Sequence, residues 1–126
     1  KIKEKNVLYL LEPYRNNTQQ KAIKKFFLKI KKSKNINIIF RPHPSENKNK
    51  YKKLINKYNS FDISIDNTSK LEDLISWSNI VVGCQTYAMV LATKARRKVF
   101  TMLPIDNQKC KLPYKKIKPF KFKSLI

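Results

Sequence analysis

Six consecutive residues with the sequence RPHPSE, from Arg41 to Glu46, form one of the two most distinctive segments of the chain and include its only histidine. His43 stands between Pro42 and Pro44, which stiffen the backbone on both sides, so the loop itself aims the imidazole. An imidazole can donate to a phosphate or a leaving-group oxygen. Arg41 adds a fixed positive charge suited to phosphate, and Glu46 can accept from hydroxyls. We expect a phosphate site here; the alternative is a proline-shaped turn in which Arg41 pairs with a carboxylate.

A second segment, GCQTYA, begins at Gly83 and follows a short β-branched run. Gly83 would let the backbone turn tightly out of a strand. A helix starting behind it would direct free N–H groups and its positive dipole end toward a ligand. The Gln85 amide and the Thr86 hydroxyl would add donors to a phosphate. The alternative is an ordinary strand-to-helix turn with Thr86 as N-cap.

The sequence lacks the common motifs for nucleotides and metals. One glycine in 126 residues argues against both the three-glycine dinucleotide loop and a Walker-type loop. No cysteine or histidine spacing indicates zinc, so we expect no metal, and we expect no cofactor. Cys84 and Cys110 make no disulfide framework, which favours a reducing, cytoplasmic setting. Cys84 has no second histidine as a base, so we do not expect a nucleophilic cysteine.

The elements that position these segments follow from hydrophobic periodicity. Apolar runs predict strands at 7–12, 36–40, 61–65, 80–82 and 99–103. Helix-spaced apolar residues lie between the strands, and Ser69 with Glu72 fits a capping box before the third helix. Strands that alternate with helices imply a parallel sheet with right-handed crossovers. We therefore predict an α/β fold: a single Rossmann-like domain with a five-stranded parallel sheet, order 3-2-1-4-5, and helices on both faces.

In such sheets ligands bind beyond the carboxyl ends of the strands, near the point where strand order reverses. The RPHPSE and GCQTYA segments both follow strands and therefore fall on that edge. Asp66 and Asp106 lie on edge loops as well, where they would touch ribose or base, or stay solvated. Residues 1–108 form the predicted Rossmann-like ligand-binding domain, and the basic, proline-rich and aromatic tail 109–126 is expected to leave it and pack elsewhere. The start at Lys1 leads us to expect an upstream partner domain.

The net charge of +21 is extreme for one domain. It indicates an anionic partner such as nucleic acid, anionic lipid or a phosphorylated substrate, or it reflects compositional drift toward Lys, Asn and Ile. No apolar run reaches the roughly 18–20 residues of a membrane span, and no signal peptide opens the chain.

The two loop segments together resemble a known enzyme class. A strand ending in RPHP before an acidic residue, then L..LI..S.IVVG..T.AM..A, is similar to the C-terminal half of two-Rossmann-domain (GT-B) bacterial glycosyltransferases. The resemblance is to capsule and lipopolysaccharide sugar transferases, including sialyltransferase-like members with a His-Pro motif. It runs from about Ile36 to Pro104.

The resemblance implies specific roles. The histidine of His-Pro contacts the donor phosphate, which carries over to His43, followed by Pro44. Hydroxyl residues at the later helix N-terminus hold the same phosphate, which carries over to Thr86, with Gln85 in place of a second hydroxyl. No acid occurs in 85–95, where many UDP-sugar enzymes of this fold bind ribose, so CMP-sugar or CDP-alcohol donors are favoured. The general base would belong to an N-terminal half.

The partners implied are a nucleotide-sugar, a glycan or lipid-linked acceptor, the N-terminal domain of the same protein and an anionic membrane surface. The protein would be cytoplasmic and peripheral at the inner membrane face. Two alternatives stay open: a sugar-nucleotide epimerase of the same fold, and a basic interaction or nucleic-acid-binding module. Lysines follow the outer face of every predicted helix rather than one face of the domain, so we do not expect a nucleic-acid partner.

Overall fold

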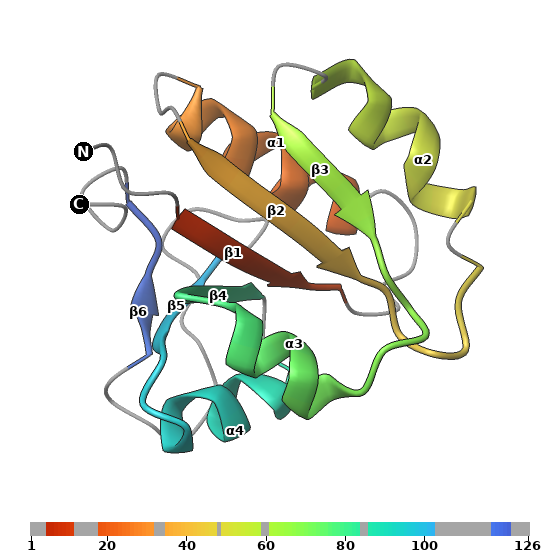
Figure 1. Cartoon of the computed structure of the whole chain (residues 1–126). Coiled ribbons are helices and arrows are strands. Elements are labelled where there is room, and N and C mark those ends of the chain that lie inside the picture. The colour runs from red at the N-terminus through yellow and green to blue at the C-terminus, as the bar shows by residue number, and fades with distance from the viewer. Residues whose placement is uncertain are drawn as a thin grey trace.

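The computed structural model describes residues 5–11, 18–31, 35–47, 49–58, 61–83, 86–102 and 117–121. In these ranges strands and helices alternate along the chain (Figure 1). The elements are β1 (Lys5–Leu10), α1 (Thr18–Ile30), β2 (Ile36–Arg41), α2 (Asn49–Ile55), the 3-10 turn η1 (Asn56–Tyr58), β3 (Asp62–Ile65), α3 (Leu71–Trp77), β4 (Ile80–Gly83), α4 (Ala88–Lys94), β5 (Lys98–Thr101) and β6 (Lys118–Pro119).

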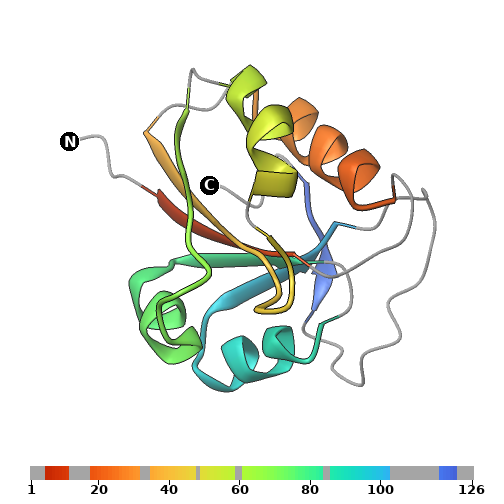
Figure 2. The same ribbon diagram turned by 90° about the vertical axis from the view of Figure 1, so that its right-hand side faces the viewer.

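The sheet has the order β3-β2-β1-β4-β5-β6, and all of its neighbouring strands are parallel. The predicted order of the first five strands is confirmed, and a sixth strand extends it. Helices α1 and α2 cover one face and α3 and α4 the other, as two perpendicular views show (Figures 1 and 2). This arrangement is the doubly wound sheet that the alternation of strands and helices predicts.

Strand β1 is central and contributes to both cores. Val7 and Tyr9 belong to the cluster under α1 and α2, whereas Leu8 and Leu10 belong to the cluster under α3 and α4. All four side chains are buried, which explains why the strand is a continuous apolar run rather than an alternating one. Rings dominate the first cluster: Tyr9 lies 5.0 Å from both Phe26 and Phe40, centroid to centroid. Aromatic pairs at this spacing add about 0.5–1.5 kcal/mol each beyond area burial.

The C-terminal segment does not leave the domain where it is described. Strand β6 pairs with β5, and the Phe120 amide donates to the Thr101 carbonyl at 2.9 Å. Phe120 is buried 5.2 Å from Phe26, and Ile117 is buried in the opposite cluster. The expectation that this tail packs elsewhere was therefore wrong for residues 117–121, because Ile117 is buried in one cluster and Phe120 in the other.

The predicted capping box of α3 is also wrong. The helix begins at Leu71 with Lys70 as N-cap, and no side chain caps it. The Ser69 hydroxyl instead donates to Asp66 at 2.6 Å, and its amide donates to the same carboxylate at 2.9 Å. Ser69 is therefore part of a turn closed by the carboxylate of Asp66, and its hydroxyl is not available to cap the helix.

Candidate functional site

The carboxyl ends of the central strands are in register along one edge of the sheet. Leu10 of β1 pairs with Arg41 of β2 on one side and with Gly83 of β4 on the other. Since neighbouring strands lie about 4.8 Å apart, Arg41 and Gly83 are separated by roughly 10 Å across β1. The strand order reverses between β1 and β4, so both predicted segments meet at the switch point where doubly wound folds bind ligands.

The loop after β2 is a tight turn that orients His43. The Glu46 amide donates to the His43 carbonyl at 2.8 Å, with Pro44 inside the turn. The Ser45 amide donates to His43 Nδ1 at 3.1 Å, and the Ser45 hydroxyl lies 2.7 Å from the same nitrogen. Because Nδ1 accepts, the neutral ring carries its proton on Nε2. The exposed imidazole therefore offers one fixed N–H donor.

Glu46 anchors this loop to α2. The hydroxyl of Tyr51 donates to both carboxylate oxygens of Glu46, at 3.0 and 2.9 Å. Tyr51 is 1% exposed. Its burial, followed by the hydrogen bond to Glu46, raises the pKa of the phenol above its ordinary value. Glu46 thus accepts from a hydroxyl of the protein itself, and this contact positions the His43 loop. Its contact with a hydroxyl of a ligand stays a prediction.

Arg41 carries an unpaired donor at the same edge. It ends β2 and is half-buried. Its Nε is buried without a hydrogen-bond partner, and among the described residues no carboxylate pairs with it. The alternative, in which Arg41 pairs with a carboxylate, is therefore not seen among the described residues. A buried guanidinium N–H without an acceptor is energetically unfavourable, and an anionic ligand at this edge would satisfy it.

Gly83 is required for packing and not for an unusual backbone angle. No glycine has a positive φ, which corrects the expectation of a tight glycine turn. A Cβ built on Gly83 would lie 3.0 Å from Met89 Sδ and 3.4 Å from the Leu10 Cβ. The absence of a side chain therefore lets α4 lie close to the end of β1 and β4.

Thr86 lies between β4 and α4 but does not cap the helix. The helix begins at Ala88, and its N-cap is Tyr87 with no side-chain cap bond. Thr86 is half-buried, and its carbonyl accepts from the Met89 amide at 3.0 Å. Its hydroxyl is thus not used as the N-cap that the alternative reading required. Gln85 lies outside the described residues, so its predicted contact stays a prediction.

The acidic side chain at the end of β3 serves its own loop. Asp66 accepts from the amides of Thr68 and Ser69 at 3.0 and 2.9 Å and from the Ser69 hydroxyl at 2.6 Å. The Ser69 hydroxyl bond is the main cause that lowers the pKa of Asp66 below its ordinary value. The carboxylate of Asp66 is therefore already used by Thr68 and Ser69, and its contact with ribose or base stays a prediction. Asp106 and Cys84 lie outside the described residues. Within the described ranges, no three His, Cys, Asp or Glu side chains gather as a metal site would require.

A family model for alpha-2,8-polysialyltransferases matches residues 1–100. The chain belongs to this family. The match confirms the resemblance to sialyltransferase-like glycosyltransferases that the RPHP and IVVG segments indicated. No curated protein sequence matches the chain.

Two solved structures have a similar fold. The beta Kdo 2,7 transferase KpsC of Thermosulfurimonas dismutans superimposes with a TM-score of 0.59 at 16% identity, over 99% of this chain and 44% of the other. The beta Kdo 2,4 transferase KpsC of the same organism gives a TM-score of 0.54 at 11% identity, over 97% and 43%. The chain therefore spans less than half the length of both. None of the described helices is long and apolar enough to cross a membrane.

Proposed function

We propose that this chain is the nucleotide-sugar-binding half of a GT-B glycosyltransferase that builds capsule or lipopolysaccharide glycans. The family match supports a glycosyltransferase and favours it over an epimerase. The observation that supports a donor-binding site is the presence of two hydrogen-bond donors at the switch point, the cationic side chain of Arg41 and the neutral imidazole of His43. Arg41 has a buried Nε without a partner, and His43 has its Nε2–H left over after Nδ1 is used.

The chemistry of this site is electrostatic. When the glycosidic bond to the nucleotide breaks, negative charge develops on the departing phosphate. Donors that are already fixed in place stabilise this charge without reorganising. The imidazole N–H of His43, the guanidinium of Arg41 and the hydroxyl of Thr86 would supply them. Glu46 and Tyr51 would act indirectly by holding the loop.

The general base that deprotonates the acceptor hydroxyl belongs, in this proposal, to a separate N-terminal half of the enzyme. The two similar solved structures are more than twice as long as the chain, which supports a second half. The isolated chain would therefore bind nucleotide weakly and would not turn over donor. Robust transfer of a sugar by this chain alone would contradict the proposal that the general base lies in a separate half.

The donor we propose is a cytidine nucleotide carrying an acidic sugar. The family is one of polysialyltransferases and the two similar solved structures are Kdo transferases, and both sialic acid and Kdo are sugars that carry a carboxylate. The acceptor would be a glycan or a lipid-linked glycan, and the enzyme would work at the cytoplasmic face of the inner membrane. The net charge of +21 suits attraction to an anionic lipid surface.

The test is a titration of the chain with CMP, CDP, UDP and GDP, followed by thermal shift and NMR. We expect CMP or CDP to bind, and His43→Ala and Thr86→Ala each to weaken binding about tenfold, the effect of one hydrogen bond to a charged group. Thr68→Ala, on the same edge but outside the proposed site, is the matched control for Thr86→Ala. If no nucleotide binds at millimolar concentration, or the control weakens binding equally, the donor site is refuted.

A further inference from the structure

Helices α1 and α2 form a cationic face of the molecule. They lie side by side on one face of the sheet, as both ribbon views show (Figures 1 and 2). Residues 18–31 and 49–58, which contain both helices and η1, hold nine lysines and neither an acidic residue nor an arginine. Helix α3 on the opposite face carries Glu72 and Asp73 and no lysine. The even spread of lysines over all helices that we expected from the sequence was therefore wrong for α3, and the positive charge is concentrated on α1 and α2.

A groove between the two helices brings three of these lysines together. It has a volume of about 340 Å³ and is lined by Gln20, Lys24, Lys53 and Lys57. Lys24 comes from α1, Lys53 from α2 and Lys57 from η1, and all three side chains are exposed and make no ion pair with a described residue. Like charges gathered in this way repel one another, and an anion between them would relieve the repulsion.

An exposed leucine lies within this charged face. Leu28 is 65% exposed, and of the described large apolar side chains on α1, α2 and η1 it is the only exposed one. It follows Lys24 by four residues and Lys21 by seven, so the three side chains lie along one stripe of α1. The core-facing stripe of the same helix consists of other residues: Ala22, Ile23, Phe26, Phe27 and Ile30. Leu28 is therefore not part of the core and is available to a partner.

Lysines around an exposed aliphatic side chain are typical of a surface that contacts an anionic membrane. The phospholipid charge attracts each lysine, and an apolar side chain that enters the headgroup region adds to binding. Sites for single-stranded nucleic acid instead use exposed aromatic rings and arginine, on which bases stack. No exposed aromatic ring occurs among the described residues of α1, α2 and η1, where Tyr58 stacks on Phe27 with centroids 3.8 Å apart. The composition of this face therefore favours lipid over nucleic acid.

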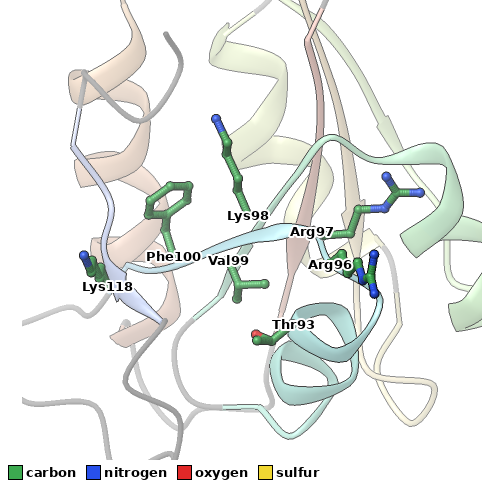
Figure 3. A pocket seen from close by; sticks show the side chains of 7 residues that line it. All are labelled: Thr93, Arg96, Arg97, Lys98, Val99, Phe100 and Lys118. Atoms are coloured by element: carbon green, nitrogen blue, oxygen red, sulfur yellow. The ribbon is translucent and has the colours of Figure 1, made fainter.

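The cations beside β5 do not form a comparable surface (Figure 3). Val99 is buried in the cluster under α3 and α4, whereas Lys98 and Phe100 point to the opposite face of the strand. Arg97 is used by the protein itself, because its Nε donates to the Ile75 carbonyl at 3.1 Å. No single ligand would face all of these cations, whereas the lysines of α1 and α2 share one face of the molecule.

We propose that the face formed by α1, α2 and η1 docks on the anionic phospholipid of a membrane. Lys24, Lys53 and Lys57 would bind headgroup phosphates at the groove, and Leu28 would enter the boundary between headgroups and acyl chains. The inference rests on the proposed function for the location at a membrane, and it adds the surface that makes the contact. Helices on a face of the sheet leave the carboxyl edge of the strands uncovered, so the proposed donor site would stay open to nucleotide while the domain is docked.

The test measures binding of the full chain to vesicles by co-sedimentation. Vesicles of phosphatidylglycerol and phosphatidylcholine in equal parts should bind the chain, and vesicles of phosphatidylcholine alone should not. One lysine near an anionic surface contributes about fivefold in affinity, so a variant that combines Lys24→Gln, Lys53→Gln and Lys57→Gln should bind about a hundredfold more weakly. Leu28→Ala should weaken binding about fivefold, because it removes apolar surface that is exposed in the free protein.

A control variant removes the same charge from the opposite face of the sheet. It combines Lys70→Gln, Lys94→Gln and Arg96→Gln, three exposed residues next to or within α3 and α4. It should weaken vesicle binding by no more than about threefold, because only the net charge changes and the contacting surface does not.

Several outcomes overturn the proposal: no binding to the anionic vesicles, equal binding to phosphatidylcholine alone, an equal loss in the control variant, or full binding by Leu28→Ala. An oligonucleotide that binds the chain more tightly than the vesicles at the same phosphate concentration would also overturn it, since the face would then be a nucleic-acid site.

Titration with CMP separates this inference from the donor site. None of the substituted lysines lies at the edge that carries Arg41 and His43, so the triple lysine variant and Leu28→Ala should keep the CMP affinity of the wild type. Circular dichroism verifies the fold of each variant. Vesicle binding without CMP binding would refute the donor site alone, and CMP binding without vesicle binding would refute the membrane face alone.

Discussion

Replacing Tyr51 by phenylalanine tests whether the contact with Glu46 holds the His43 loop. The change removes one buried hydroxyl that donates to both carboxylate oxygens and leaves the ring in the core. A hydrogen bond to a charged group contributes about 1.5–3 kcal/mol. Glu46 is half-buried and can regain water, so the lower end, about 1.5 kcal/mol, applies. For 126 residues this lowers Tm by about 5–6 °C.

Thermal unfolding followed by circular dichroism measures this difference, and Tyr58→Phe is the matched control. Tyr58 stacks on Phe27 with centroids 3.8 Å apart, and the described part of the chain shows no hydrogen bond to its hydroxyl. The control should therefore shift Tm by no more than about 1 °C. The same Tyr51→Phe variant should also weaken nucleotide binding, because the imidazole of His43 loses its fixed position.

The pH dependence of the free energy of unfolding provides an independent test of the Tyr51 contact. The pKa of Tyr51 is raised in the folded state above its ordinary value of 10.0. The unfolded chain therefore loses this proton first, so the stabilisation is fully present below pH 10 and is lost as pH rises beyond it. The advantage of the wild type over Tyr51→Phe should shrink above pH 10 by up to about 1.4 kcal/mol per pH unit. Equal stability at pH 7, or an advantage that does not change above pH 10, refutes the reasoning.

Three further substitutions test the packing and the backbone around the sheet. Arg96 has a φ of 63°, in the left-handed region that favours glycine, so Arg96→Gly should raise the free energy of unfolding by about 0.5–1 kcal/mol in urea titrations; a loss would contradict that account. Gly83→Ala should lower it by about 1 kcal/mol, since the new methyl group displaces the buried Met89, and an unchanged urea midpoint would show that the close contact is unimportant. Asp66→Asn should lower the free energy of unfolding by about 1 kcal/mol at pH 7. One carboxylate oxygen accepts from the Ser69 amide and the other from the Ser69 hydroxyl, and the NH2 group of asparagine cannot accept either bond. The lowered pKa of Asp66 means that its contribution is present above about pH 3.8 and lost as pH falls further, so wild type and variant should converge in acid.

The two predicted segments reach one edge of the sheet for a reason that one sequence can reveal. Arg41 and Gly83 each end a strand that is recognisable from its apolar run, and parallel strands place their carboxyl ends together. What the sequence could not give is the state of each donor. Arg41 Nε is buried without a partner, and His43 Nδ1 accepts from the Ser45 amide. Both facts depend on which neighbours pack against these side chains.

The sequence by itself determined the α/β class, the strand order of the first five strands and the edge that carries the loops. It did so because periodicities of 2 and 3.6 residues are local and parallel crossovers have one hand. Only the tertiary structure decided that residues 117–121 join the sheet, that Tyr51 holds Glu46, and that Lys24, Lys53 and Lys57 line one groove. These contacts join residues by side-chain packing and charge, and neither leaves a repeating pattern along the chain.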